Sequence, residues 1–304
     1  MSEIKKQKKK ETFAPIGKVS NRWGWGFVSI SVIMISVLVF IPMIQSFLLS
    51  LQSGQGNQLT FAGLSNYKRM LTDTTFRKAL VNTFLYLLVQ VPVMIILALF
   101  ISVLLNDKKL KCRSFFRIAI FLPCVTSLVS YSLIMKSIFS GDGLVNQILM
   151  AMHLISEPIG WTTSPAFAKA LIIISITWRW TGYNMIFYLS GLQNIDPSIY
   201  EAAELDGCNG FQKFFKIIVP QLKPIILFTT ITSTIGTLQL FDESVNLTKG
   251  GPANATITMS HYIYNGSFGE GVANFGYASA MSVIVFIMVA ILAFINLKVG
   301  DKRD

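Results

Sequence analysis

The sequence predicts an all-α membrane protein with six transmembrane helices. Its 304 residues are 52% hydrophobic and only 13% charged, with a mean hydropathy of +0.56. A soluble domain carries about 25% charged residues, so the composition argues against a water-soluble fold. Two further observations support the prediction. Long apolar runs can each cross about 30 Å of hydrocarbon with about 20 residues, and Lys and Arg gather beside these runs.

Six stretches have the length and composition that a transmembrane helix requires. The first follows a basic tail over residues 1–25. Its apolar run is too long for a signal peptide and no Ala-x-Ala-like site follows, so we expect an uncleaved anchor. The fifth stretch is the least apolar. The expected spans, within a transmembrane domain over residues 26–300, cover 26–50, 80–105, 115–138, 167–190, 222–241 and 277–298.

The cations predict the direction of the spans, because Lys and Arg are enriched in cytoplasmic segments. With the N-terminus inside, most of them face the cytosol, and the outer segments 52–79, 139–166 and 242–276 hold few. We therefore expect both termini and the loop over residues 195–221 to be cytoplasmic. The cations on that side are Lys5, Lys6, Lys8, Lys9, Lys10, Lys18, Arg22, Lys108, Lys109, Lys111, Arg113, Arg117, Lys213, Lys216, Lys223, Lys298, Lys302 and Arg303.

The chain shows no sequence pattern of an enzyme or of a metal site. Cys112, Cys124 and Cys208 are odd in number and lack ligand spacing, and His153 and His261 are far apart. No Gly-x-x-x-x-Gly-Lys-Ser/Thr loop occurs, so the sequence has no P-loop. The cations flank apolar runs and do not form a basic and aromatic face, which disfavours nucleic acid. We expect no catalytic residue, no metal and no cofactor bound by this chain.

Residues 201–220 form an unusual polar segment between two apolar stretches. Glu201 to Asp206 favours a helix with acidic residues in its first turn. Gly207 and Gly210 allow the backbone to turn, and residues 211–218 predict a second short helix before the fifth span. The residues alone fit two hypotheses equally well: an interfacial loop without a partner, and a docking element for a cytosolic protein.

The same segment resembles a known signature. Glu201-Ala202-Ala203, Gly207, Ile217, Val219 and Pro220 have the spacing of the EAA motif of permease subunits of bacterial binding-protein-dependent ABC importers. Val219 in place of Leu and Cys208 in place of Ala are mild departures. Over residues 26–300 the chain is similar to the carbohydrate-uptake branch, which includes multiple-sugar, glycerol-phosphate and maltose-type permeases. The segments that carry this likeness are Phe61–Tyr67, Ala79–Thr83, Gly191–Ile195 and Leu247–Pro252.

The resemblance implies a type I ABC importer permease fold and a multi-pass location in the bacterial cytoplasmic membrane. It implies a heterodimer with a second, homologous permease and an extracellular solute-binding protein that delivers the ligand. It also implies two cytoplasmic ABC ATPase subunits, which use ATP and Mg²⁺ and contact the EAA segment as a coupling helix. The residues that match this coupling role are Glu201, Ala202, Ala203, Asp206, Gly207, Ile217 and Pro220.

Polar and aromatic residues within the spans are candidates for a substrate pathway. Trp180, Tyr183 and Asn184 have the spacing that places them on one helical face. Aromatic rings, amides and carboxylates are the groups that bind sugars, although the same side chains also serve helix packing and interface anchoring. The candidates are Tyr131, Arg179, Trp180, Tyr183, Asn184, Gln239, Asp242 and Glu243.

Arg179 is expected near the middle of the bilayer, where an Arg costs about 2.5–3.5 kcal/mol on insertion scales and should face water or a partner. Gln239, Asp242 and Glu243 have helical spacing at the outer end of the fifth span. The two carboxylates are then about a dozen ångströms above Arg179, which predicts no direct salt bridge. A role at an outer gate and a role in docking a binding protein are equally open for them.

The sequence therefore predicts the permease subunit of an ATP-driven importer for a sugar or oligosaccharide. Glycerol phosphate and polyols remain alternative substrates. The alternative from another class is a secondary transporter driven by an ion gradient. It would need inverted repeats and membrane-buried carboxylates, whereas the carboxylates here are expected in loops and at span ends.

Overall fold

The computed structural model of the protein describes residues 18–56, 58–107, 109–269 and 271–300. Residues 1–17 of the basic tail expected over residues 1–25 lie outside the described residues. The same holds for Lys108, Lys302 and Arg303. The chain divides into two compact units, Met1–Leu48 and Leu49–Asp304.

The first unit contains one long apolar helix. α1 (Lys18–Ile35), the π-helical turn η1 (Ser36–Phe40) and α2 (Ile41–Ser50) follow one another without a break. Between residues 23 and 48 most side chains are exposed and apolar. A helix that is apolar on all sides suits lipid, in agreement with the first expected span.

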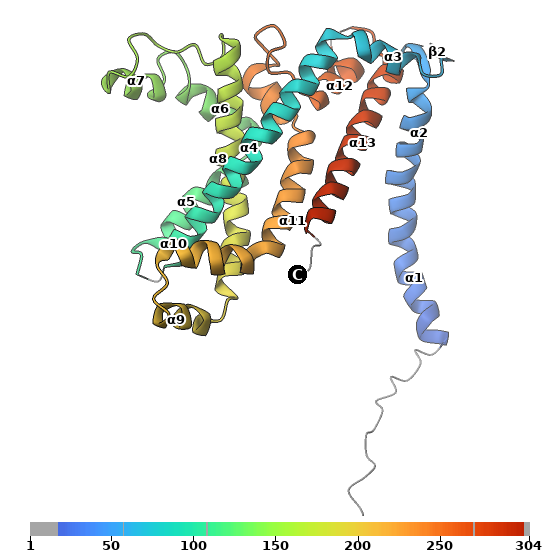
Figure 1. Ribbon diagram of the computed structural model, residues 1–304. Helices are drawn as coiled ribbons and strands as arrows, with labels where there is room; N and C mark the ends of the chain where they lie inside the picture. Colours follow the sequence, from blue (N-terminus) through green and yellow to red (C-terminus); the bar gives the residue numbers. More distant parts are fainter. Residues whose placement is uncertain (1–17, 57, 108, 270, 301–304) are drawn as a thin grey trace, which may run out of the picture. The chain divides into compact units, whose positions relative to one another are not determined.

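In the described residues of the second unit, the regular structure is helical apart from one short hairpin (Figure 1). β1 (Gln52–Gln55) and β2 (Gln58–Phe61) pair antiparallel, a feature that the all-α prediction did not include. The helical elements are α3 (Ser65–Thr72), α4 (Thr74–Asn106), α5 (Arg113–Val125), α6 (Leu128–Ile138), α7 (Leu144–Ala151), α8 (Pro165–Gln193), α9 (Pro197–Leu205), α10 (Gly210–Lys213), η2 (Phe214–Ile218), α11 (Val219–Leu238), η3 (Ser244–Thr248), α12 (Met259–Phe268) and α13 (Phe275–Gly300).

Helices occupy all six positions where spans are expected. Among the described residues, four segments are long and apolar enough to cross a membrane: Trp23–Ser50, Thr74–Asn106, Gly210–Leu238 and Phe275–Lys298. α5 and α6 meet at a bend of 107°, so the expected third span is broken and adds a fifth crossing only if the pair is taken as one. α8 has 29 residues, but polar residues around Arg179 interrupt its apolar run.

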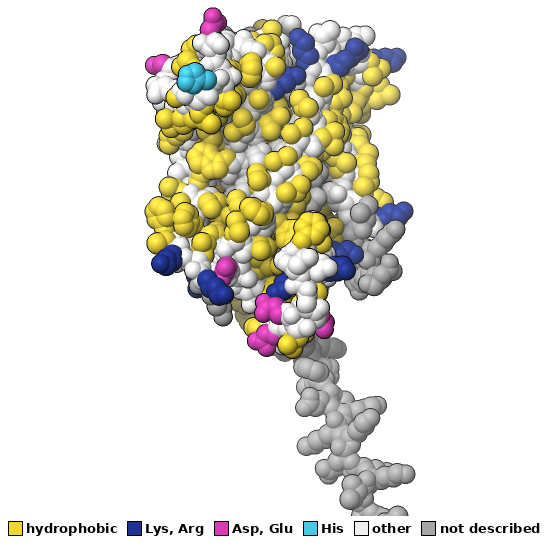
Figure 2. All heavy atoms as spheres, turned by 60° about the vertical axis from the view of Figure 1, so that its left-hand side comes forward, with side chains coloured by type: hydrophobic (Ala, Val, Ile, Leu, Met, Phe, Trp, Pro, Cys, Tyr) yellow, Lys and Arg dark blue, Asp and Glu magenta, His cyan; other side chains and the backbone are white. Residues whose placement is uncertain are grey.

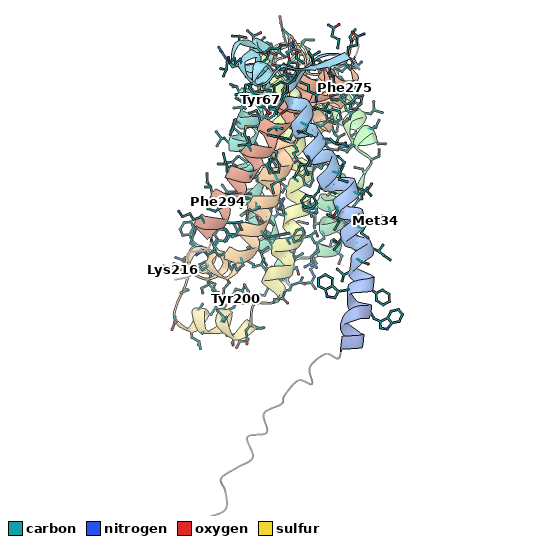
Figure 3. All side chains as sticks on the ribbon, turned by 90° about the vertical axis from the view of Figure 1, so that its right-hand side faces the viewer. Met34, Tyr67, Tyr200, Lys216, Phe275 and Phe294 are labelled. Atoms are coloured by element: carbon teal, nitrogen blue, oxygen red, sulfur yellow. The ribbon has the colours of Figure 1, made fainter. Side chains whose placement is uncertain are left out.

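The polar connections of the second unit lie at its two ends. In Figure 3, Tyr67 and Phe275 lie at one end, and Tyr200 and Lys216 lie at the other. On the face shown in Figure 2, hydrophobic side chains fill the middle and Lys and Arg lie towards both ends. The end with Tyr200 is the one that the charge distribution predicts to be cytoplasmic.

α8 forms the centre of the second unit. It packs along α4 and against α5, and Leu171, Ile172, Met185 and Tyr188 are fully buried in it. Lipid is as apolar as these side chains, so helices in a membrane associate through close packing and polar contacts. The hydroxyl of Tyr188 supplies such a contact, 2.6 Å from Oγ1 of Thr229 in α11.

Two glycines allow neighbouring helices to approach α8 closely. A Cβ at Gly182 would collide with the backbone carbonyl of Ile120 in α5. A Cβ at Gly191 would collide with the side chains of Leu222 and Ile225 in α11. Small residues at such crossings are a usual device of membrane helices. α8 is thus held against α5 near its middle and against α11 near its end.

At the end expected outside the cell, one carboxylate joins four helices. Asp73 follows α3 and caps α4, where it accepts hydrogen bonds from the backbone N–H groups of Thr75 and Phe76 at 2.8 and 3.1 Å. The hydroxyls of Tyr262 in α12 and Tyr277 in α13 donate to its other oxygen at 2.6 and 2.7 Å. Burial raises the pKa of Asp73, but these four hydrogen bonds outweigh it and hold the pKa below its ordinary value.

We expect Asp73→Ala to lower the free energy of unfolding by about 1–3 kcal/mol, because it removes a helix cap and leaves two tyrosine hydroxyls unpaired. The charged carboxylate stabilises the fold above its unfolded pKa, near 4, and this contribution is lost as the pH falls through the lowered folded pKa. Thermal unfolding of the wild type and of Asp73→Ala in detergent, at pH 7 and below pH 4, measures the loss of stability and its dependence on pH. The difference in unfolding free energy between these two proteins should be smaller below pH 4 than at pH 7.

Asp107→Ala is the matched control. Asp107 is exposed at the opposite end of α4 and accepts a hydrogen bond from the N–H of Lys109 at 2.8 Å. We expect it to change the unfolding free energy by less than about 0.5 kcal/mol. Equal effects of the two variants would contradict the structural role of Asp73.

Candidate functional site

The segment over residues 195–221 folds into α9 and, after a tight turn at the end expected in the cytosol, α10, which continues through η2 into α11 (Figure 1). The expected second short helix is therefore the beginning of the longer helix that forms the fifth span. α9 ends in a Schellman motif: Cys208 N–H donates to the carbonyl of Ala203 at 2.9 Å, and Gly207 N–H donates to that of Glu204 at 3.1 Å. Gly207 has φ +73°, the left-handed conformation that only glycine adopts without cost. The turn at Gly207 is therefore specified by the sequence.

A second set of contacts fixes the helix that follows. Asn209 and Gln212 form a capping box at the start of α10, with hydrogen bonds of 2.8 and 3.0 Å. The ammonium of Lys213 lies 2.7 Å from Oε1 of Glu204 and so joins the two helices. This hydrogen bond and the charge of Lys213 hold the pKa of Glu204 below its ordinary value. The loop has a defined shape although most of it is exposed.

The start of α9 differs from the prediction. The helix begins at Pro197, four residues earlier than expected, and Asp196 caps it by accepting from the N–H of Ser198 at 2.9 Å. Glu201 is therefore in the second turn, and no acidic residue lies in the first. Asp196-Pro197 is itself a start signal for a helix, because Asp is a favoured cap and Pro suits the first helical position.

The coupling candidates divide between an exposed and a buried side of this loop. Ala203 is buried, Ile217 is half-buried, and the other five are exposed. Tyr200, Phe214 and Ile218 pack into the hydrophobic cluster formed by the ends of α4, α8 and α11. Leu205 and Phe211 face away from it and are 90% and 73% exposed. The loop thus has a rigid attachment to three helices and a free apolar surface.

A sharp bend separates α5 from α6 beside the middle of α8. Pro123 lies in the last turn of α5, and Thr126 and Ser127 have extended backbone angles. The hydroxyl of Thr126 donates to the carbonyl of Pro123 at 3.0 Å, which satisfies an acceptor at the helix end. The expected third span is therefore two helices, because proline and the extended pair prevent the first from continuing.

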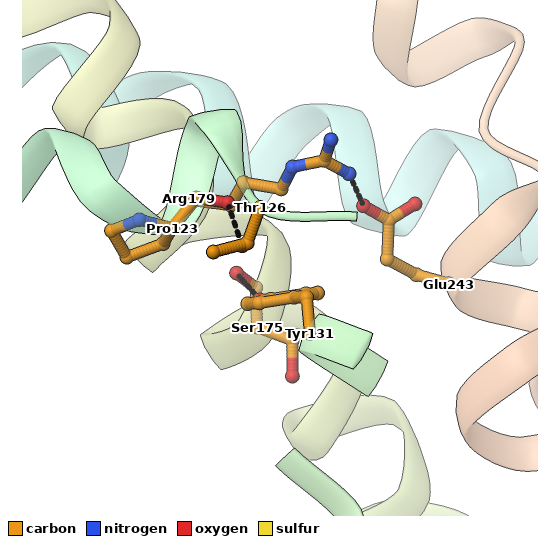
Figure 4. Close-up of polar contacts among 6 residues, drawn as sticks. All are labelled: Pro123, Thr126, Tyr131, Ser175, Arg179 and Glu243. Carbon is orange, nitrogen blue, oxygen red and sulfur yellow. Dashed lines mark hydrogen bonds and ion pairs between the residues drawn. The ribbon is translucent and has the colours of Figure 1, made fainter. Parts of the chain in front are cut away.

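Arg179 and Glu243 form a buried ion pair (Figure 4), which corrects the expectation that they would be too far apart. Nη1 of Arg179 lies 3.4 Å from Oε1 of Glu243, and the two side chains are 12% and 5% exposed. The expectation failed because α11 ends at Leu238 and does not run to 241. The chain then turns, and the short helix η3 packs against α6 and α8 and places Glu243 level with Arg179.

Tyr131 of α6 belongs to the same cluster. Its hydroxyl donates to the carbonyl of Ser175 at 2.5 Å, and its ring centroid lies 5.7 Å from Cζ of Arg179. The ring of Trp180 lies 5.6 Å from the same atom. The guanidinium is thus held between two aromatic rings and one carboxylate, which compensates part of the cost of burying its charge.

Trp180 and Tyr183 line a pocket of about 210 Å³ between α4, α8 and α11. Their rings meet edge to face, with centroids 5.5 Å apart. Gln90 of α4 reaches the pocket, where its Oε1 accepts from the hydroxyl of Thr237 at 2.9 Å. The remaining lining residues are Ile176, Thr232, Ser233, Gly236 and Leu240. Aromatic faces, hydroxyls and one amide are groups that can bind a hydroxylated ring.

Of the eight pathway candidates, only Trp180 and Tyr183 line this pocket. Tyr131, Arg179 and Glu243 belong to the buried cluster described above, and the other three lie elsewhere. The amide of Asn184 donates to the carbonyl of Trp180 at 2.9 Å and to Sδ of Met94 at 3.1 Å. Gln239 is exposed after the end of α11, and Asp242 is half-buried. The helical spacing expected for Gln239, Asp242 and Glu243 is wrong, because no single helix contains them.

Gln90, like its hydrogen-bond partner Thr237, is a polar pocket residue that the sequence analysis missed. It is buried, and it lies within the long apolar run of α4. A lone amide inside such a run has to find a partner in the protein, which is a recognisable signal. Ser244 and His261 are a second missed contact, with Oγ 2.9 Å from Nδ1 in the segment after α11. Their positions in the sequence give no indication of it.

Several polar atoms along α8 are buried without a hydrogen-bond partner in the part of the chain that the structure describes. Oγ of Ser175, Nε of Arg179 and Oδ1 of Asn184 are three of them. Oγ1 of Thr177 and Oγ1 of Thr181 complete the set on this helix. They share one helix with Trp180 and Tyr183 of the pocket and with the buried ion pair.

Comparison with known proteins identifies the family. Residues 76–301 match the family described as "Binding-protein-dependent transport system inner membrane component". The chain belongs to this family. The family predicted from the spacing of the EAA motif is confirmed. Because the chain also has several long apolar helices, it is a multi-pass membrane protein.

Relatives with curated names carry the likeness over nearly the whole permease. The lactose transport system permease protein LacF of Rhizobium radiobacter is 53% identical over 282 residues, which is 92% of this chain and 94% of that protein. The arabinooligosaccharides transport system permease protein AraP of Bacillus subtilis is 34% identical, covering 88% of this chain and 86% of that protein. These names confirm the resemblance to the carbohydrate-uptake branch.

Solved structures show the same fold. A chain of a bacterial ABC transporter involved in the import of the acidic polysaccharide alginate has a TM-score of 0.79 with this permease. The likeness covers 94% of this chain and 97% of that one at 21% sequence identity. The type I permease architecture is therefore confirmed at the level of the fold.

We expect Arg179→Met and Glu243→Leu each to destabilise the permease by about 3–5 kcal/mol, because each leaves one buried charge unpaired. The double variant should recover much of the loss, since it buries no charge. Thermal unfolding of the four proteins in detergent gives the coupling energy as a double-mutant cycle. Additive losses would contradict a direct pair.

Proposed function

We propose that this chain is the permease subunit of an ATP-driven importer for a sugar or oligosaccharide. The sugar-transport names of several relatives support the substrate class. The observation that carries the proposal is the loop of α9 and α10. Caps at both helices fix the shape of this loop, and its buried side packs against the ends of α4, α8 and α11.

In this proposal the loop lies in the cytosol and receives the motion of an ATPase. Two ABC ATPase subunits hydrolyse ATP with Mg²⁺, and one of them contacts Glu201, Ala202, Asp206 and the exposed apolar side chains of Leu205 and Phe211. The exposed side chains of Leu205 and Phe211 give this contact apolar surface to bury. Because the root of the loop packs against the ends of α4, α8 and α11, a push on α9 moves these helices together.

The remaining partners complete the pathway. A second, homologous permease forms a heterodimer with this chain, and an extracellular solute-binding protein delivers ligand to the opposite end. Both termini are cytoplasmic in this arrangement, as the distribution of Lys and Arg favours. Closure of the ATPases then switches the pathway between inward-facing and outward-facing states, so this chain conducts the substrate and performs no chemical step.

The pocket beside Trp180 and Tyr183 is the proposed place of sugar contact. Its volume of about 210 Å³ suits one ring of a substrate. The Trp180 ring supplies an apolar face for the C–H groups of a pyranose, and Gln90 and Thr237 supply hydrogen bonds. Arg179 and Glu243 lie beside the pocket as a positioning pair that holds α8 against η3.

We expect Gly207→Val to uncouple ATP hydrolysis from sugar uptake while the membrane complex still assembles. The reason is that a β-branched residue cannot adopt the left-handed backbone conformation without strain. ATP-dependent uptake into proteoliposomes and ATP hydrolysis measured on the same sample test this. Uptake should fall by at least about tenfold, a change that corresponds to about 1.4 kcal/mol.

Gly210→Val is the control for this change. Gly210 lies in the same loop, has an ordinary negative φ, and a Cβ there meets no atom within 4 Å. We expect the control variant to keep most of its uptake. Normal uptake by Gly207→Val would exclude the coupling role of the turn.

We expect Trp180→Ala to raise the half-saturating sugar concentration, or to lower the uptake rate, by about tenfold, because it removes the proposed stacking platform. Trp178→Ala serves as the control, since Trp178 is on the same helix, is 42% exposed and does not line the pocket. Equal uptake by both variants would place the sugar elsewhere.

A further inference from the structure

A second pocket lies at the end of the molecule that is expected outside the cell, and the proposed transport path does not use it. It has a volume of about 730 Å³ and lies between α6, η3 and α12. It shares no lining residue with the pocket beside Trp180. Its polar lining residues are Ser132, Lys136, Asn246, Lys249, His261, Tyr264 and Asn265.

The charge of this pocket is positive. Lys136 and Lys249 line it, and among the residues that the structure describes neither forms an ion pair and no carboxylate lines the pocket. His261 also lines the pocket, and its Nδ1 is 2.9 Å from Oγ of Ser244. Burial lowers the pKa of His261, so its imidazole is neutral at pH 7 and adds no charge.

One buried polar group in the pocket lacks a partner. Ser132 is 2% exposed and lines the pocket, and its hydroxyl oxygen has no hydrogen-bond partner among the described residues. A buried hydroxyl without a partner is unfavourable, and a ligand in the pocket that formed a hydrogen bond with it would remove that cost.

Helix electrostatics explain only part of this arrangement. Lys136 lies in the last turn of α6, where a cation suits the helix dipole. Lys249 follows η3 in a left-handed conformation and is exposed, and Ser132 lies one turn before Lys136. The dipole of α6 accounts for neither of these two residues, whereas an anionic ligand accounts for both.

The remaining lining residues indicate what kind of anion fits. Tyr264 and Phe268 are adjacent aromatic rings, with centroids 5.8 Å apart, and both line the pocket. Asn246 and Asn265 present amides, which can both donate and accept hydrogen bonds. Aromatic rings with amides bind hydroxylated rings, and lysines bind a carboxylate.

We propose that this pocket binds an acidic sugar, a hydroxylated ring that carries a carboxylate such as a uronate. The carboxylate lies between Lys136 and Lys249, the hydroxyl of Ser132 and the two Asn amides bind ring hydroxyls, and Tyr264 or Phe268 covers one ring face. This inference rests on the proposed function, since it adds a second sugar site on the outer side of a sugar importer.

The test uses the complete transporter that contains this permease, in lipid nanodiscs, with glucuronate, glucose and acetate as probes. Saturation-transfer NMR titrations give the three affinities. We expect glucuronate to bind at least about tenfold more tightly than either glucose or acetate. Lys136→Gln/Lys249→Gln should remove this preference, and Ser132→Ala, which breaks no hydrogen bond of the protein, should weaken glucuronate by about threefold to tenfold.

Lys68→Gln/Lys169→Gln is the matched control. It removes two lysines that lie at the same end of the molecule as the pocket but do not line it. It should leave the preference intact. Equal affinity for glucuronate and glucose would overturn the proposal, and so would glucuronate binding that survives loss of both pocket lysines. Acetate binding as tight as glucuronate would overturn the sugar class, since a bare anion would then suffice.

ATP-dependent uptake of a neutral sugar by the same complex separates this proposal from the one it rests on. Uptake that is normal in wild type and in Lys136→Gln/Lys249→Gln, without any preference for glucuronate, rejects only the second pocket. Failure of the wild-type complex to import any sugar rejects the proposed function itself.

Discussion

Close packing around α8 is the constraint on which the rest of this structure depends. In lipid, burial of apolar side chains does not drive helices together, so contact has to come from fit and from polar pairs. α8 has both. Gly182 admits the backbone of α5, Gly191 admits side chains of α11, and Tyr188 meets Thr229. The pocket and the buried ion pair exist because α4, α5 and α11 can lie this close to α8.

Much of this fold could be predicted from the sequence, because the bilayer imposes a simple rule on length and polarity. The apolar runs from 80 to 105 and from 277 to 298 are helices within a few residues of the expected bounds. The turn at Gly207 could also be predicted, since a glycine after a helix and a capping residue two positions later are local signals. Local chemistry decides such features, so neighbours in space are not needed to find them.

The features that could not be predicted depend on contacts between distant segments. No proline or glycine follows the end of α11 at Leu238, and Gly236 in its last turn does not by itself mark a helix end. This end nevertheless changes where Glu243 lies and creates the pair with Arg179. Pro123 could have indicated the bend between α5 and α6, but an isolated proline is common in membrane helices and does not by itself give an angle of 107°. Of the pathway candidates, Trp180 and Tyr183 share a pocket, whereas Asn184 on the same turn bonds to Met94.

The unsatisfied atoms of α8 have a consequence for how the protein works. Five polar atoms between Ser175 and Asn184 are buried without a hydrogen-bond partner among the described residues, and leaving such a group unpaired costs about 1–3 kcal/mol. At 3.6 residues per turn, Ser175 and Arg179 lie on one face of α8, and Thr177, Thr181 and Asn184 lie on the opposite face. Hydrogen-bond partners for both faces are then supplied from outside the described residues, by water or by another chain.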